Sequence, residues 1–64
     1  MCLSTVYKNS MTDETVVMRN VMHIACKDGC VIATDLMERT VSIEGVLKEA
    51  NLIEGFVVVE ETKV

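Results

Sequence analysis

The sequence predicts an all-β protein: a small barrel-like sheet of about five to seven short strands with one short helical turn. Short segments rich in β-branched residues alternate with polar or glycine-containing turns along the whole chain. The 64 residues include no proline, and the only stretch with helical propensity, residues 46–51, is long enough for about one turn. A chain of this length forms at most one domain, which we expect to cover residues 1–64.

The first half of the chain predicts four strands, at residues 2–8, 14–18, 21–27 and 30–36. Asp28-Gly29, between the last two, is typical of a two-residue type I′ hairpin, because both turn positions require a positive φ. In such a hairpin Lys27 lies opposite Cys30, and Cys26 then faces the other side of the sheet from Cys30. This geometry disfavours a disulfide or a shared metal; only a three-residue loop, 27–29, would bring the two sulfurs together.

The second half predicts a strand at 40–43 that ends at Gly45, a helical turn at 46–51 and a last strand at 52–60 with a bulge or bend at Gly55. The segment Val57-Val58-Val59 is apolar on both faces, so it needs cover on both sides. We expect the barrel to cover one side and a second subunit the other. Half of all residues are hydrophobic, which also favours a homodimer.

Composition excludes several function classes. The sequence has no run of 18 or more apolar residues, so we expect no membrane span. Three cysteines without a secretion signal favour a location in the cytoplasm. The net charge of −4, scattered Lys and Arg and two aromatic residues argue against nucleic acid. The sequence has no nucleophile motif and no phosphate-binding loop, so we expect that the protein is not an enzyme with its own catalytic site. The carboxylates read as solvated surface groups: Asp13, Glu14, Glu38, Glu60 and Glu61.

Cys2 is the strongest candidate for chemistry. If Met1 is removed, the Cys2 thiolate and its free amine form a five-membered chelate ring, and the Leu3 backbone nitrogen can add a further donor. Amine, amide and thiolate donors suit square-planar Ni(II), and two such termini could supply four donors to one ion. The alternative is an ordinary cysteine in the first strand.

The other possible metal ligands can equally be explained by ordinary structural roles. His23 could be a metal ligand or a base. A histidine with no functional role in its strand is the favoured interpretation, because a single imidazole ring without partners does not indicate a site. Cys26 and Cys30 could bind a metal or serve as small buried hydrophobes. The four internal methionines favour core packing over a soft copper site: Met11, Met18, Met22 and Met37.

These features together resemble the CooT family, nickel-binding accessory proteins of carbon monoxide dehydrogenase maturation. The resemblance lies in Met1-Cys2-Leu3, the glycine hairpin and residues 40–61, TVSIEGVLKEANLIEGFVVVEE. A similar start occurs in HypC-type hydrogenase chaperones, but those continue with a proline that this chain lacks.

The resemblance implies a homodimeric barrel that binds Ni(II) through Cys2 and serves carbon monoxide dehydrogenase or its maturation proteins. His23, Cys26 and Cys30 lie outside the family pattern, so any metal role for them would be a departure. An RNA-binding or protein-binding adaptor with no metal role stays open as the alternative.

Overall fold

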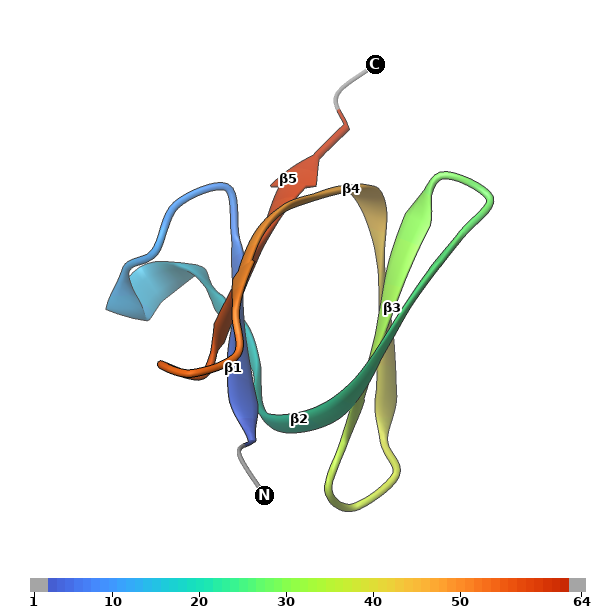
Figure 1. Ribbon diagram of the computed structural model, residues 1–64. Coiled ribbons are helices and arrows are strands. Elements are labelled where there is room, and N and C mark those ends of the chain that lie inside the picture. The colour runs from blue at the N-terminus through green and yellow to red at the C-terminus, as the bar shows by residue number, and fades with distance from the viewer. Residues whose placement is uncertain (1–2, 63–64) are drawn as a thin grey trace.

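Residues 3–62, the part of the chain that the computed structural model describes, fold into five strands and one 3-10 turn (Figure 1). No helix in this part is long and apolar enough to cross a membrane. The all-β prediction is confirmed. The elements are β1 (Ser4–Lys8), η1 (Asp13–Thr15), β2 (Val16–Lys27), β3 (Cys30–Asp35), β4 (Thr40–Asn51) and β5 (Phe56–Glu61).

The strands close into a barrel in the order β1-β2-β3-β4-β5. Each strand pairs antiparallel with the next one along the chain. An odd number of strands in such a meander leaves the first and last running in the same direction, so the barrel closes through a parallel pair. That pair runs from Thr5 opposite Phe56 to Lys8 opposite Val59.

Two strands, β2 and β4, are long because each bends and pairs with a different neighbour in each half. The first half of β2 pairs with β1 and the second half with β3. Asn20, at the bend, has a φ of 57°, a left-handed conformation that asparagine tolerates. The separate strands predicted at 14–18 and 21–27 were therefore wrong: residues 16–27 form one bent strand.

The helical turn predicted at 46–51 was also wrong. The second half of β4 instead pairs with β5 from Gly45 opposite Glu61 to Asn51 opposite Phe56, with a register shift between Leu47 and Glu49. The pairing with β5 outweighs the local helical preference of this segment, because β5 needs a strand on its second edge to close the barrel. Gly45 bends the strand without ending it, and 52–55 form a turn before β5.

The core fills the barrel with small apolar side chains. Along β3, buried residues alternate with half-buried ones, as expected where one face of a strand lines an interior. The interior cluster comprises Val6, Val21, Val31, Ala33, Ile43, Val57 and Val59. Val58 is also buried although it stands outside this cluster. Tyr7 and Glu49 lie opposite it on the neighbouring strands, so Val58 is covered within one chain and needs no second subunit.

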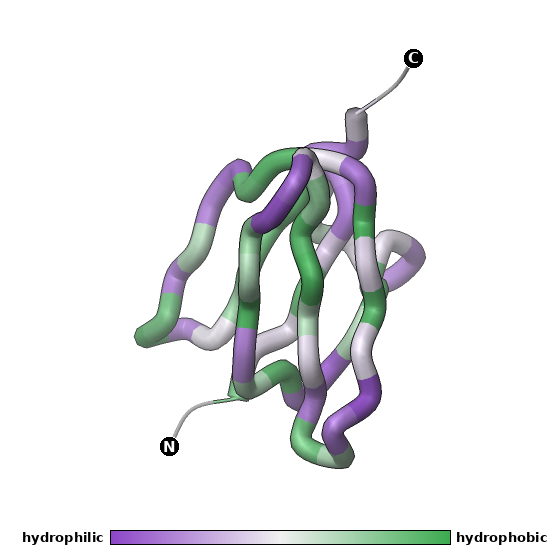
Figure 2. Tube along the Cα trace, turned by 90° about the vertical axis from the view of Figure 1, so that its right-hand side faces the viewer, coloured by the Kyte–Doolittle hydropathy of each residue, from purple (hydrophilic) through white to green (hydrophobic). Residues whose placement is uncertain are grey.

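Three of the four internal methionines do not pack in the core as predicted. Met18 packs against the core cluster, but Met11, Met22 and Met37 are largely exposed. A five-stranded barrel of this length holds mostly valines in its interior, and these three methionines fall on loops or on the bend of β2. Hydrophobic and hydrophilic residues alternate along the chain, and some of the hydrophobic residues lie in turns as well as in strands (Figure 2).

Candidate functional site

Cys2, the predicted nickel ligand, lies outside the described residues, but Leu3, to which it is bonded, is described. Leu3 is half-buried beside the turn between β4 and β5. A Cβ atom placed on Gly55 would lie 3.2 Å from the Leu3 carbonyl oxygen. Two residues further on, the Thr5 amide donates a 2.9 Å hydrogen bond to the Gly55 carbonyl. The segment that follows Cys2 is thus held against this turn.

The turn itself is held by Asn51. The Asn51 Oδ1 accepts hydrogen bonds from the backbone amides of Ile53, at 3.1 Å, and Glu54, at 2.8 Å. The Gly55 amide donates to the Asn51 carbonyl at 2.9 Å. With the backbone fixed in this way, the side chains of Leu52 and Ile53 project into solvent, 69% and 93% exposed.

Beside the turn lies a hollow of about 280 Å³ at the same end of the barrel as Leu3. It is lined by Ser4, Val21, Met22, His23, Ile24, Leu52 and Val57. His23 is therefore the predicted secondary ligand that lies nearest to the N-terminal segment. Its strand partner is Thr34, and the residue is exposed.

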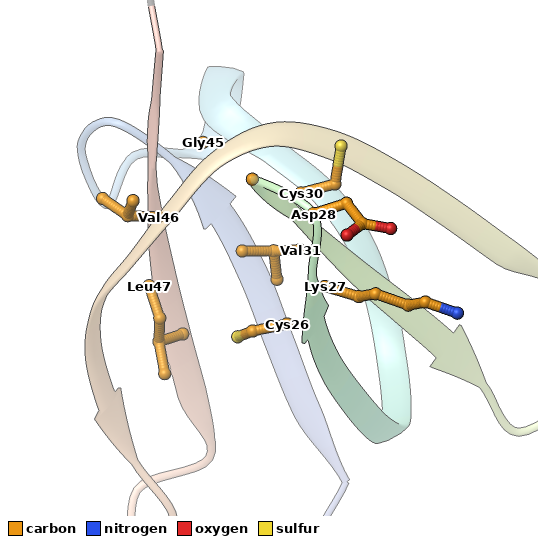
Figure 3. A pocket seen from close by; sticks show the side chains of 9 residues that line it. Cys26, Lys27, Asp28, Cys30, Val31, Gly45, Val46 and Leu47 are labelled. Atoms are coloured by element: carbon orange, nitrogen blue, oxygen red, sulfur yellow. The ribbon is translucent and has the colours of Figure 1, made fainter.

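The cysteine hairpin has the predicted geometry. Asp28 and Gly29 have φ values of 54° and 75°, Lys27 pairs with Cys30, and Cys26 pairs with Val31. Figure 3 shows the two sulfurs pointing in different directions, that of Cys26 toward Leu47 and that of Cys30 away from it. Both thiols are free.

A second hollow lies between this hairpin and β4, and Cys26, Val31 and Leu47 are among the residues that line it (Figure 3). Cys26 is exposed at this hollow, so the alternative of a small buried hydrophobe was wrong for Cys26. Cys30 is half-buried. Within residues 3–62, no group of three or more His, Cys, Asp or Glu side chains is arranged to hold a metal ion.

Four of the carboxylates expected on the surface are exposed: Asp13, Glu14, Glu38 and Glu60. Glu61 is half-buried, and its Oε2 lies 3.7 Å from the Lys8 ammonium. A pair this open to solvent contributes little to stability.

Asp35 is a buried carboxylate that the sequence analysis did not single out. It is 2% exposed at the end of β3. Its Oδ1 accepts from the amides of Met37 and Arg39, both at 2.9 Å, and its Oδ2 accepts from Arg39 Nε at 2.8 Å. The backbone hydrogen bond from Arg39 is the main cause that lowers the Asp35 pKa; burial opposes it, and the Arg39 guanidinium reinforces it. The signal in the sequence was an aspartate at a strand end with an arginine four positions on.

Comparison with known proteins identifies the family. The family model of CO dehydrogenase accessory protein CooT matches residues 1–60. A search of curated proteins gives no match. The matched region includes Cys2, Leu3, the hairpin and β5 up to Glu60, so it covers the segments on which the resemblance was based except for Glu61. The chain therefore belongs to the CooT family, whose role is that of an accessory protein to CO dehydrogenase.

Proposed function

We propose that this protein binds Ni(II) through Cys2 where two copies meet, and that it holds or delivers nickel for the maturation of CO dehydrogenase. The observation that carries the proposal is a cysteine at position 2 within a CooT match that begins at residue 1. Nickel is here the cargo of the protein. The enzyme that uses it is the client.

The donor chemistry of the N-terminal segment fits nickel. Removal of Met1 leaves a thiolate and an amine on Cys2, which close a five-membered ring around a metal ion. The amide nitrogen of Leu3, the next residue along the backbone, can add a third donor. Nitrogen and sulfur donors of this kind favour the square-planar geometry that Ni(II) adopts.

Among residues 3–62, no competing site with three metal-binding side chains is found. Residues 3–62 lack a cluster of three metal-binding side chains, and the Cys26 and Cys30 sulfurs point in different directions. The barrel interior is occupied by valine, alanine and isoleucine side chains, which supply no donors. These observations support a metal site built on Cys2 and its neighbouring backbone.

A second copy completes the donor set. One N-terminal segment supplies at most one thiolate with its adjoining nitrogens, whereas two segments can offer two thiolates and two nitrogens to one four-coordinate ion. We therefore propose a homodimer with Cys2 from each copy at the contact.

Titration with Ni(II), followed through the thiolate-to-nickel charge-transfer absorption, tests the proposal. The wild-type protein, with Met1 removal verified by mass spectrometry, should develop the band, and native mass spectrometry should report one nickel per two chains. Cys2→Ser should abolish the band. Cys26→Ser is the matched control, because it removes an exposed thiol elsewhere and should leave the band intact.

Two results would contradict the proposal. One is an unchanged band in Cys2→Ser. The other is a folded, Met1-free wild-type protein that gives no band at all, which would favour the adaptor alternative with no metal role.

A further inference from the structure

We infer that His23 gives this chain a second mode of metal binding, in which the Cys2 thiolates and the His23 imidazoles of two copies hold one Zn(II) ion. The inference rests on one part of the proposed function, namely that the two Cys2 residues meet. The nickel site of that proposal takes its nitrogens from the backbone beside each thiolate. The zinc site takes its nitrogens from a side chain on β2 instead.

A bulge in β2 turns the His23 side chain to the outside of the barrel. Val21 pairs with Asp35, and the next pair along the ladder is His23 with Thr34. Met22 is therefore an extra residue on β2 that has no partner on β3. Val21 is buried, whereas the next two side chains, those of Met22 and His23, are both exposed. Bulges re-aim side chains in this way, so the imidazole is accessible to a metal ion.

This stretch of β2 lies beside the start of β1, which the N-terminal segment precedes (Figure 1). Ser4 pairs with Val21, and Ser4 and His23 line the same hollow of about 280 Å³. Because β1 and β2 run antiparallel, each step back from Ser4 corresponds to one step forward from Val21. Cys2 and His23 are each two residues beyond this pair. Two residues span at most about 7 Å, so the hollow that His23 lines is within reach of Cys2.

The His23 ring is free of other partners among residues 3–62. None of the hydrogen bonds or ion pairs of side chains found there uses it. No group of three metal-binding side chains is found within the same residues. A metal ion at His23 therefore needs donors from the N-terminal segment, and Cys2 supplies the thiolate.

The resulting donor set favours zinc over nickel. Two thiolates and two neutral imidazoles form the tetrahedral set that is typical of structural Zn(II) sites. One chain supplies only one donor of each kind, so the ion requires both copies. Zinc and nickel then compete for the same Cys2 thiolates but take their nitrogens from different groups. This difference allows a substitution to remove one binding mode and leave the other.

Titration of the Met1-free protein with Zn(II) against a chromophoric chelator tests the inference. Native mass spectrometry should report one zinc per two chains, and Co(II) in place of zinc should give the intense visible absorption of a tetrahedral thiolate site. His23→Ala should lower the zinc affinity by about 100-fold or more, because loss of a ligand costs more than the about 10–100-fold that loss of an outer-shell partner costs. The nickel charge-transfer band should be unchanged. His23 is exposed, so the variant should stay folded by circular dichroism.

Glu54→Gln is the matched control. Glu54 is exposed in the turn whose Gly55 lies against the Leu3 carbonyl, so its carboxylate is the alternative zinc donor at this end of the barrel. Its removal should leave the zinc affinity unchanged. A chain with one residue added before Cys2 gives the converse test. Its Cys2 amine is part of a peptide bond, so the chain should bind nickel more weakly and keep its zinc affinity.

The outcomes separate this inference from the nickel proposal. Loss of zinc in His23→Ala with the nickel band retained would support the zinc site. Wild-type zinc affinity in His23→Ala would overturn the inference, whatever the nickel titrations show. One zinc per single chain, or a weak octahedral Co(II) spectrum, would also overturn it. So would a loss of zinc affinity in Glu54→Gln as large as that in His23→Ala.

Discussion

Gly45 tests whether the bend of β4 requires a residue without a side chain. A Cβ atom at this position would lie 3.0 Å from the Glu61 Cα and still closer to the Glu60 carbonyl oxygen. Carbon atoms pack best at about 3.5–4.0 Å, so β4 and β5 would have to separate by about 0.5–1.0 Å. The Gly45 amide already donates to the Gly29 carbonyl at 3.0 Å, and the same shift would strain this bond.

The expected cost of Gly45→Ala is therefore at the upper end of overpacking penalties, about 3 kcal/mol. A domain of 64 residues has a free energy of unfolding of about 3–10 kcal/mol, so the variant should lose a large part of its stability. The melting temperature should fall by about 12–24 °C.

Gly29→Ala is the matched control. Gly29 has a φ of 75°, but a Cβ atom there would meet nothing within 4 Å. The cost is then conformational alone, about 1 kcal/mol, or about 4–8 °C in melting temperature. Thermal unfolding followed by circular dichroism measures both variants under the same conditions. A Gly45→Ala protein that melts at or above the temperature of Gly29→Ala would refute the reasoning.

Two further predictions concern stability. Asp35→Asn should lower the urea midpoint at about pH 6. Because the folded-state pKa of Asp35 lies below its ordinary value of 3.8, its contribution is complete above that value and lost as pH falls through the lower, folded-state pKa. The gap between the wild-type and variant midpoints should therefore narrow as the pH falls below 3.8, and a gap that stays constant would contradict this. Val59→Ala removes two methyl groups from a fully buried side chain and should cost about 2 kcal/mol in urea unfolding; a cost below about 0.5 kcal/mol would show that the barrel collapses around the gap.

Local chemistry explains which parts of the fold could be predicted from the sequence. The Asp28-Gly29 hairpin was correct, with its register and the opposite faces of Cys26 and Cys30, because two adjacent positive φ values demand a turn of one kind. The alternation of buried and half-buried residues in β3 follows from the same local rule. These features depend on residues that are close in sequence.

The errors have more than one cause. The segment 46–51 has the composition of a helical turn, yet it is a strand because β5, several residues later, pairs with it. Leu52 and Ile53 read as the start of a strand, whereas the Asn51 side chain turns the chain there and exposes both residues. The exposure of Leu52 and Ile53 could therefore not be predicted from hydrophobicity, which is the same for a buried strand and an exposed turn.

Barrel size also bears on where a metal can bind in this protein. The interior of residues 3–62 is filled by small apolar side chains, so donors from facing strands have no room to converge there. Among residues 3–62, Glu61 pairs with Lys8 at the surface, and the buried Asp35 pairs with Arg39. On our proposal the metal donors are instead backbone nitrogens and one thiol of the N-terminal segment, and not side chains inside the barrel. One such segment has too few donors for a four-coordinate ion, so on this proposal full coordination of nickel requires contact between two copies.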